Sequence, residues 1–204
     1  LARGREKVLQ DLKLSEQVDC VVGVLETEVL PTNSALQQIA DQCKVQVDGL
    51  RIAIAPATSI AGSLQVVARS IETAMHKLHE LQFDVGSVIS ATGHAPLPPP
   101  AKRGDVVGGI GRTNDAILYG STVTLWVDHD DDAIADVIER VPSNASPDHG
   151  QTFAKVFKQY EYDFYKVDPL LFSPARVNIH NLRSGKSFGS GELSRDLLAE
   201  SFGI

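Results

Sequence analysis

Arg69 and Glu72 are the two residues of this chain whose types and spacing best suit acid–base chemistry. They stand three positions apart in a helical pattern, so both side chains face the same way. A carboxylate can take a proton from an attacking water, and a neighbouring cation can orient either group. The simpler interpretation is a solvated helix face with one surface ion pair, worth at most about 1 kcal/mol. Spacing alone favours this simpler interpretation.

The residues in front of this pair favour a ligand site. An apolar strand pattern over residues 50–54 ends at Pro56, which has no N–H to donate to a sheet ladder. A loop of small residues follows and leads into a helix expected from Ser63 to Leu81. In this arrangement loop amides and a helix N-terminus face a ligand. Small and hydroxyl residues gather in the loop, namely Thr58, Ser59, Gly62 and Ser63.

The expected helix has an apolar face and a polar face. The apolar face carries Leu64, Val67, Ile71, Ala74, Met75 and Leu78. The polar face carries Gln65, Arg69, Glu72 and His76. The first face is expected to pack in the core, which leaves the second to meet a ligand or solvent.

A glycine-rich segment over residues 105–115 is a second candidate site. As a loop, its amides could approach a phosphate or the heteroatoms of a ring, and Asn114 and Asp115 could add hydrogen bonds. The alternative is a flexible loop that ends in an Asx turn. The segment matches neither the dinucleotide-binding fingerprint nor the phosphate-binding P-loop, so this indication is weak.

Aromatic residues crowd the segment over residues 160–175. Phe164 and Phe172 are expected to pack two layers together, whereas Tyr165 and Lys166 could reach a ligand. A run of aspartates after His129 suggests a metal cluster at first sight. It is better explained as acidic residues at a helix N-terminus, because no histidine pair has a metal-ligand spacing.

Composition excludes several classes of protein. The chain has 204 residues, of which 43% are hydrophobic and 22% charged, as in ordinary globular domains. A net charge of −7 argues against a nucleic-acid binder, which needs a basic face. No apolar stretch approaches the roughly 20 residues of a membrane helix, and residues 1–13 do not look like a signal peptide. Cys20 and Cys43 are expected to be reduced, buried thiols, which indicates a cytoplasmic protein.

Strand and helix patterns alternate along the chain, which predicts an α/β fold. Strands are expected over residues 19–30, 50–55, 85–91 and 116–127, and an antiparallel hairpin over residues 175–189. Residues 2–17 are expected to form a polar helix or an entry segment. Helices are expected over residues 33–43, 63–81, 133–140, 151–160 and 194–201, with Asn33 or Ser34 as the cap of the first of these. Four prolines exclude regular structure over residues 94–100.

Several blocks of this sequence, in the same order, resemble methenyltetrahydromethanopterin cyclohydrolases. The blocks are APATSIAGSLQ with RSIETA (residues 55–74), SATGHAP (90–96), GRTND with Tyr119 (111–119), VPS (141–143), DHG with Phe153 and Phe157, and YDFYKVDPLLFSPA (162–175). Together they span most of the chain from about residue 20 onward. The first and last blocks are long enough to be highly specific.

The resemblance implies an enzyme of one-carbon metabolism. Such enzymes add water to the methenyl bridge of N5,N10-methenyltetrahydromethanopterin and release N5-formyltetrahydromethanopterin, or run the reverse. They use no metal or redox cofactor and form homotrimers. They bind the pterin between two domains of a fold with mixed sheets flanked by helices.

The resemblance also implies how this chain is organised. Residues 1–18 would be a lead-in segment that continues from an N-terminal part. Residues 19–204 would form the pterin-binding and catalytic region, with an optional division near residues 92–105. A separate chain that supplies the N-terminal part is a further option.

The family's Arg-x-x-Glu pair falls on Arg69 and Glu72. The resemblance therefore implies that Glu72 is the general base and that Arg69 orients Glu72 or the water. The residues chosen as substrate contacts are Ser59, Ser63, Gln65, Thr113, Asn114, Asp115, Tyr119, Tyr165 and Lys166.

Some positions depart from the archaeal members of this family. Those members carry Arg-Cys in place of His94-Ala95 and a second tyrosine in place of Gly120. The differences suggest the bacterial, methylotroph-type branch, where the reaction serves formaldehyde oxidation. Two other functions stay open: a module that binds a pterin or a phosphate without turnover, and a metal-assisted amidohydrolase that uses the acidic patch near His129.

Overall fold

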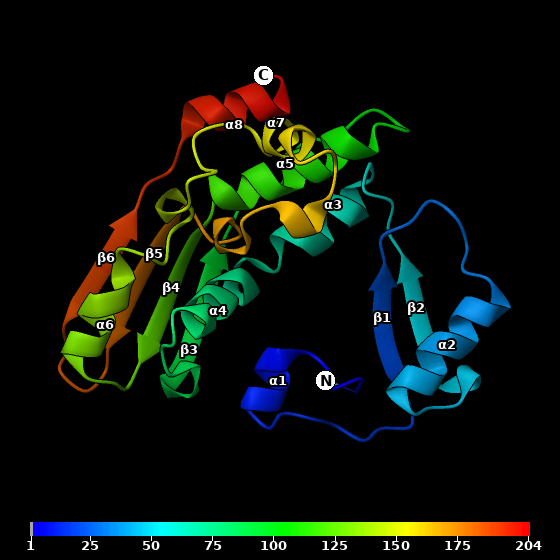
Figure 1. Cartoon of the computed structure of the whole chain (residues 1–204), viewed down its shortest axis with the longest axis horizontal. Coiled ribbons are helices and arrows are strands. Elements are labelled where there is room, and N and C mark those ends of the chain that lie inside the picture. The colour runs from blue at the N-terminus through cyan, green and yellow to red at the C-terminus, as the bar shows by residue number, and fades with distance from the viewer. Residues whose placement is uncertain (1) are drawn as a thin grey trace. The chain divides into compact units, whose positions relative to one another are not determined.

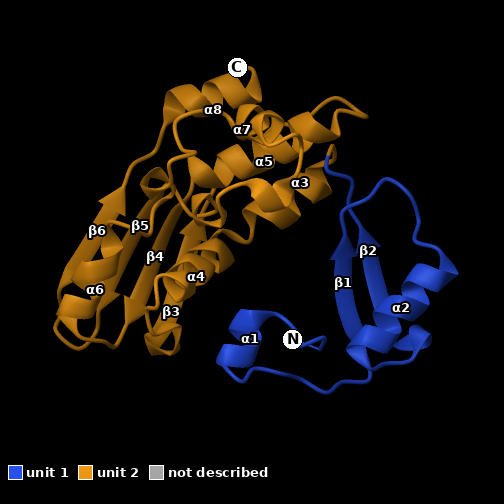
Figure 2. Ribbon diagram, in the orientation of Figure 1, with its two compact units in different colours: residues 1–57 blue, residues 58–204 orange. Residues whose placement is uncertain are grey.

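The computed structural model describes residues 2–204, which form two compact units. One unit extends to Ala57, and the other runs from Thr58 to Ile204 (Figure 2). Both units contain strands and helices, which confirms the α/β class. The further division expected near residues 92–105 stays a prediction.

The smaller unit is built around two parallel strands. Its elements are α1 (Lys7–Asp11), β1 (Val21–Leu25), α2 (Asn33–Cys43), the 3-10 turn η1 (Val47–Gly49) and β2 (Leu50–Ile54). Val21 lies opposite Leu50, and the pairing continues to the end of both strands. Parallel strands need a crossover connection, and α2 supplies it.

The helix α2 begins one residue earlier than its expected cap. Thr32 is the cap, because its side-chain oxygen accepts the N–H of Ala35 at 3.2 Å. The sequence placed the cap at Asn33 or Ser34, which was wrong; both lie inside the helix. The helix ends at Lys44, which adopts the left-handed conformation with φ of 59°.

The larger unit contains a four-stranded mixed sheet. Its strands, in spatial order, are β3 (Val88–His94), β4 (Thr122–Val127), β5 (Arg176–Asn181) and β6 (Ser187–Gly191). The outer pairs, β3 with β4 and β5 with β6, are antiparallel, and the central pair is parallel. The hairpin expected near the C-terminus is therefore confirmed as β5 and β6.

Two helices cover one face of this sheet, and the other helices of the unit pack mainly against one another. The helices are α3 (Ile60–Val67), α4 (Ser70–Glu80), α5 (Val106–Leu118), α6 (Asp131–Ile138), α7 (Phe153–Gln159) and α8 (Arg195–Phe202). Short 3-10 turns are η2 (Val85–Ser87), η3 (Ser143–Ala145), η4 (Phe164–Lys166) and η5 (Pro169–Leu171). Figure 1 shows α4 and α6 on the same face of the sheet, where α4 contacts β3 and β4, and α6 contacts β5 and β6.

Alternation along the central strands explains which face these helices cover. Val123, Leu125 and Val127 of β4 are fully buried, while the residues between them are half-buried. Val177 and Ile179 of β5 are also fully buried, and each lies directly opposite a buried residue of β4. One face of the sheet is therefore the core face, and the helices pack against it.

Aromatic side chains form a second core between α5, α7 and the segment before β5. Phe153 and Phe157 of α7 stack on each other with ring centroids 5.7 Å apart. Phe164 and Phe172 stack more closely, at 4.7 Å. The two phenylalanines thus pack together as the sequence indicated, although Phe164 remains 42% exposed.

The helix expected over residues 63–81 is two helices. α3 ends at Val67 and α4 begins at Ser70, while Arg69 stands between them with φ of −93° and ψ of 16°. The break lets the first turn of α4 approach β3 closely: a Cβ on Gly93 would stand 2.7 Å from the Ser70 hydroxyl. Helical periodicity continues through the break, and so the sequence pattern did not reveal it.

The glycine-rich segment over residues 105–115 is helical. α5 starts after Asp105, whose side chain accepts the N–H of Gly108 at 2.9 Å, and it continues to Leu118. Glycine disfavours helices by about 1 kcal/mol per residue. Packing offsets that cost, since Gly111 lies against Ala154 of α7. The expectation of a loop was therefore wrong.

Two strand boundaries move for related reasons. The strand expected over residues 116–127 is only β4, because α5 occupies its first residues. The strand expected over residues 85–91 begins at Val88 after the turn η2 and continues to His94. Beyond His94 the proline-rich segment has no regular structure, as expected.

Both cysteines carry free thiols in the structure. Cys20 is exposed and Cys43 is half-buried, so the expectation that both are buried was wrong. Within residues 2–204, no helix has the length and apolar character needed to cross a membrane.

Candidate functional site

The Arg69–Glu72 pair lies at the break between α3 and α4. Nη1 of Arg69 and Oε1 of Glu72 are 3.7 Å apart, and the two side chains are 54% and 64% exposed. Glu72 stands in the first turn of α4, where the helix dipole favours a negative charge. The pair is therefore an ion pair whose two groups remain accessible to a ligand.

Buried residues on both sides hold this break in place. Val67, two positions before Arg69, packs against Ala116 of α5 and Phe202 of α8. Ala74 and Leu78 of α4 are fully buried. The backbone that carries Arg69 and Glu72 is thus fixed by the core although the side chains are not.

An open groove of about 290 Å³ borders the break. Its lining comes from the end of α3, the start of α4 and the end of β3, and consists of Leu64, Val67, Ala68, Ser70, Ile71, Gly93, His94 and Ala95. Leu64 is 54% exposed, although the sequence assigned it to the core face of a helix. That part of the expected apolar face was wrong, because the helix ends before the face is complete.

The sequence did not identify Ser70, Ile71, Gly93 and Ala95 as groove residues. A signal was present, since residues 90–96 form one of the blocks that carry the family resemblance. The close approach of Ser70 to Gly93 could not be read from either segment, because it joins residues that are far apart in the chain.

The hydroxyl and amide residues before the pair have mixed surroundings. Ser59 caps α3, since its Oγ accepts the N–H of Gly62 at 2.9 Å. Ser63 is only 2% exposed, and Gln65 is half-buried. A ligand beside α3 would therefore reach Ser59 and Gln65 more easily than Ser63.

Two of the α5 residues bond to their own helix. The Thr113 hydroxyl donates to the carbonyl oxygens of Gly109 and Ile110 at 3.1 and 3.0 Å. The Asn114 amide donates to the carbonyl of Ile110 at 2.8 Å. Thr113 is buried and Asn114 half-buried, so α5 presents little of either side chain.

Asp115 in the last turn of α5 and Tyr119, which caps the end of that helix, bind the backbone before α7. Asp115 Oδ1 accepts the N–H of Phe153 at 2.8 Å, which caps α7 from outside its own sequence. The Tyr119 hydroxyl donates to the carbonyl of Gln151 at 2.6 Å and accepts the N–H of Gly150 at 3.1 Å. These contacts attach α7 to α5.

Burial changes the acidity of Asp115 strongly. The side chain has no exposed surface, and this desolvation raises the pKa of Asp115 to about 7. The Ser201 hydroxyl and the Phe153 amide act in the opposite direction, whereas the charge of Glu200 adds to the increase. Burial likewise raises the pKa of Tyr119.

Tyr165 and Lys166 lie on the turn η4. Tyr165 is 98% exposed, and Lys166 forms an ion pair with Glu161 at 3.2 Å. Both side chains are open to solvent.

The structure thus places the expected site residues in three surroundings: exposed on η4 and at the α3–α4 break, partly covered on α3, and buried on α5. Their roles in catalysis and substrate binding stay predictions.

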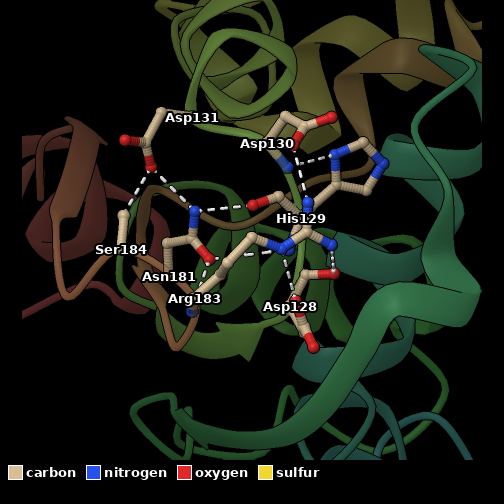
Figure 3. A network of polar contacts seen from close by, with 7 residues as sticks. All are labelled: Asp128, His129, Asp130, Asp131, Asn181, Arg183 and Ser184. Atoms are coloured by element: carbon tan, nitrogen blue, oxygen red, sulfur yellow. Dashed lines mark hydrogen bonds and ion pairs between the residues drawn. The ribbon is translucent and has the colours of Figure 1, made fainter.

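The acidic patch near His129 is an ion-pair and hydrogen-bond network (Figure 3). Arg183 bonds to Asp128 at 2.8 Å through Nε and to Asp130 at 2.6 Å through Nη1. Lys186, Ser184 and Asn181 bind Asp131 and lower the pKa of its carboxyl to about 2. Within residues 2–204, no group of three or more His, Cys, Asp or Glu side chains is arranged to hold a metal ion.

Known proteins resemble this chain over nearly its whole length. A family model described as cyclohydrolase (MCH) matches residues 1–202. A protein of Rhodopirellula baltica named methenyltetrahydromethanopterin cyclohydrolase is 59% identical, over 99% of this chain and 62% of its own length. A protein of the same name from Methylobacillus flagellatus is 43% identical, over 98% and 61%.

A third relative with that name, from Methanococcoides burtonii, is 38% identical over 98% of this chain and 62% of its own length. The chain thus spans about three fifths of the length of these curated relatives. The match of the family model and the identity to its relatives show that the chain belongs to the cyclohydrolase (MCH) family.

Proposed function

We propose that this chain is the part of a methenyltetrahydromethanopterin cyclohydrolase that carries its general base, Glu72. The observation that supports the proposal most is the accessible Arg69–Glu72 pair, whose charged atoms are 3.7 Å apart. The residues next to the pair in the chain, Ala68, Ser70 and Ile71, line an open groove. The membership of the family supplies the substrate class, since the curated relatives carry that name.

The chemistry of the substrate explains why a carboxylate is needed. The methenyl carbon lies between two nitrogens in a cationic amidinium and is already electrophilic, so water needs a base more than a Lewis acid. Glu72 accepts one proton from water as the oxygen bonds to this carbon. The new hydroxyl then releases its remaining proton to solvent as it becomes the formyl carbonyl. Glu72 passes its proton to N10 while the carbon–N10 bond breaks, which leaves the formyl group on N5 and releases one proton overall. The reverse reaction follows the same path.

Arg69 supports this step by position and charge. Its guanidinium lies beside the carboxylate and can orient Glu72 or hold the attacking water. The groove between α3, α4 and β3 combines polar lining with apolar side chains such as Leu64, Val67 and Ile71, which suits the flat ring of a pterin with its ring heteroatoms. Ser59, Ser63, Gln65, Thr113, Asn114, Asp115, Tyr119, Tyr165 and Lys166 remain the proposed substrate contacts.

The wider expectations are part of the same proposal. The enzyme would serve one-carbon metabolism and formaldehyde oxidation in the cytoplasm, use no metal or redox cofactor, and act as a homotrimer. The part of the relatives outside the match would complete the pterin site, whether it belongs to the same chain or to a separate one.

The decisive experiment follows the loss of the methenyl chromophore when protein is added to methenyltetrahydromethanopterin, against a protein-free blank. The assay is run on this chain and on a chimera that adds the unmatched part of the Rhodopirellula baltica relative. Turnover well above the blank is expected for the chimera. A chimera that binds the pterin without turnover would identify a binding module instead, and loss of turnover in a strong chelator would point to a metal-assisted amidohydrolase.

The variant Glu72→Gln then tests the base. Glutamine keeps the size of the side chain but cannot accept the proton, so we expect kcat to fall by about 10²–10⁴-fold while pterin affinity stays within a few-fold. Glu80→Gln, on the exposed side of the last turn of α4, is the matched control and should keep full activity. Near-normal kcat in Glu72→Gln would remove Glu72 as the base.

A further inference from the structure

Lys77 is a buried lysine that the proposed reaction does not use. It belongs to α4, the helix that carries Glu72, and only 2% of its surface is exposed. Its Nζ donates a hydrogen bond to the main-chain carbonyl of Leu170 in η5. One side chain thus joins two segments that are 93 positions apart.

Burial of this ammonium group needs an explanation. A buried charge is costly unless it is paired and hydrogen-bonded, and an apolar side chain of similar length would avoid that cost. Burial lowers the pKa of Lys77 to about 8, while the charge of Asp168 acts in the opposite direction. The Lys77 ammonium therefore gives up its hydration for a hydrogen bond to the Leu170 carbonyl. This cost indicates that the hydrogen bond has a structural role.

The segment at the other end of this contact is held by a network. Asp168 accepts the N–H of Leu170 at 3.0 Å through Oδ1 and the hydroxyl of Ser146 at 2.6 Å through Oδ2. Its own N–H donates to Asp148, which also accepts the hydroxyl of Tyr160. Leu170 is thus fixed by bonds to both its N–H and its carbonyl.

This network encloses the stretch that carries two proposed substrate contacts. Tyr160 lies before Tyr165 and Lys166, and Leu170 lies after them, so both ends of the stretch are bonded. Between these ends, Tyr165 and Lys166 point into solvent, and their side chains do little to fix the turn η4. Phe164 of η4 stacks on Phe172, so this ring contact and the side-chain hydrogen bonds at the two ends together fix where η4 lies.

We propose that Lys77 is a positioning residue that attaches the Tyr160–Leu170 segment to α4 and so sets where Tyr165 and Lys166 lie relative to Glu72. The expected effect on substrate binding rests on the proposed function. The expected effect on the position of the Tyr160–Leu170 segment does not. Lys77 itself touches no substrate. Its effect passes through Leu170 and η5.

The structural consequence is tested by hydrogen exchange on the ligand-free protein. In Lys77→Met the aliphatic stem is kept and the donor is lost, so amides over residues 163–171 should exchange about tenfold faster, the factor expected for loss of one hydrogen bond to a charged group. Lys155→Met is the matched control, because Lys155 is an exposed lysine whose partner, Glu200, is a surface carboxylate. Exchange over residues 163–171 that equals wild type in Lys77→Met would overturn the proposal.

The catalytic consequence is tested on the active chimera. Lys77→Met should raise KM about tenfold and change kcat less, because the substrate contacts move while the base stays, and Lys77→Arg should recover part of the loss by restoring a donor. A KM within twofold of wild type together with faster exchange would overturn the link to substrate binding. Absence of turnover in the unmutated chimera would refute the proposed function alone, since the exchange experiment would still decide the positioning role.

Asp168→Asn is a second variant for the case in which Lys77→Met does not fold. It keeps an acceptor for the N–H of Leu170 but removes the charge beside Lys77 and weakens the bond from Ser146. The same amides should exchange faster, by a smaller factor. Unchanged exchange in this variant, with a folded protein, would also contradict the proposal.

Discussion

At the scale of single residues, the chemistry of a side chain was easier to predict than its surroundings. Arg69 and Glu72 lie together and accessible, as their spacing in the sequence indicated. Asp115 and Tyr119 also have polar groups that suit a ligand, yet in the structure they bind the backbone before α7. The three-residue spacing in the expected helix predicted the first pair, although the structure places Arg69 just before α4. The second contact joins α5 to a segment more than 30 positions away.

The buried carboxyl of Asp115 makes stability depend on pH. Its pKa is raised from 3.8 to about 7 in the folded protein, so the folded state favours the neutral form. Its contribution to stability is therefore complete below about pH 4 and is lost as pH rises through 7. The difference of about three units corresponds to a loss on the order of 4 kcal/mol.

The variant Asp115→Asn tests this effect. Asparagine keeps an oxygen that can accept the N–H of Phe153 but carries no charge at any pH. Relative to wild type, the variant should gain several kcal/mol of unfolding free energy at pH 8 compared with pH 4.5, measured by urea denaturation. Asp196→Asn, at an exposed position of α8, is the control and should show no such change. A pH-independent difference for Asp115→Asn would contradict the raised pKa.

At the scale of elements, local patterns predicted most helices and strands but missed two features that packing decides. The hairpin of β5 and β6 and the helix α2 follow turn residues and periodicity. The break at Arg69 and the helix α5 do not, because each depends on a distant partner: Gly93 of β3 for the first and Ala154 of α7 for the second. Glycines that look like a loop in sequence serve as contact surfaces between elements.

Asn181 at the end of β5 shows how two loops are joined. It is 2% exposed, and its amide donates to the carbonyl of His129 and to Asp131, each at 2.7 Å. Its oxygen accepts the N–H of Arg183 at 3.0 Å. One buried side chain thus connects the β4–α6 loop with the turn of the hairpin (Figure 3).

Asn181→Ala should therefore destabilise the protein by about 2–3 kcal/mol, since it leaves buried polar groups without partners. The comparison is Arg183→Ala, which removes the exposed ion pairs to Asp128 and Asp130 and should cost about 1 kcal/mol or less. Urea denaturation of the two variants and wild type measures both values. An equal or larger loss for Arg183→Ala would show that the ion pairs, rather than the buried amide, hold the two loops.

At the scale of the whole molecule, the two units differ in how well each buries its own apolar surface. In the smaller unit, two parallel strands leave Val22 and Val24 of β1 78% and 50% exposed, and an open apolar groove of about 360 Å³ runs along β2. Parallel sheets are normally covered on both faces, and two strands alone are marginally stable. The larger unit has four strands, helices on the core face and a second aromatic core.

These differences predict that residues 58–204 fold without the smaller unit. Every buried residue of the β4 and β5 core face lies within this range, as does the cluster around Phe153. A fragment of residues 58–204 should show a cooperative thermal transition by circular dichroism, whereas a fragment of residues 1–57 should show none. In the longer fragment, the turn at Arg69 and the network around Asn181 should keep their protection from hydrogen exchange. The structure gives residues 58–204 complete hydrogen-bonded strands and a buried core, which is why we expect cooperative unfolding. If this fragment instead unfolded without cooperativity, its core would need residues from outside this range.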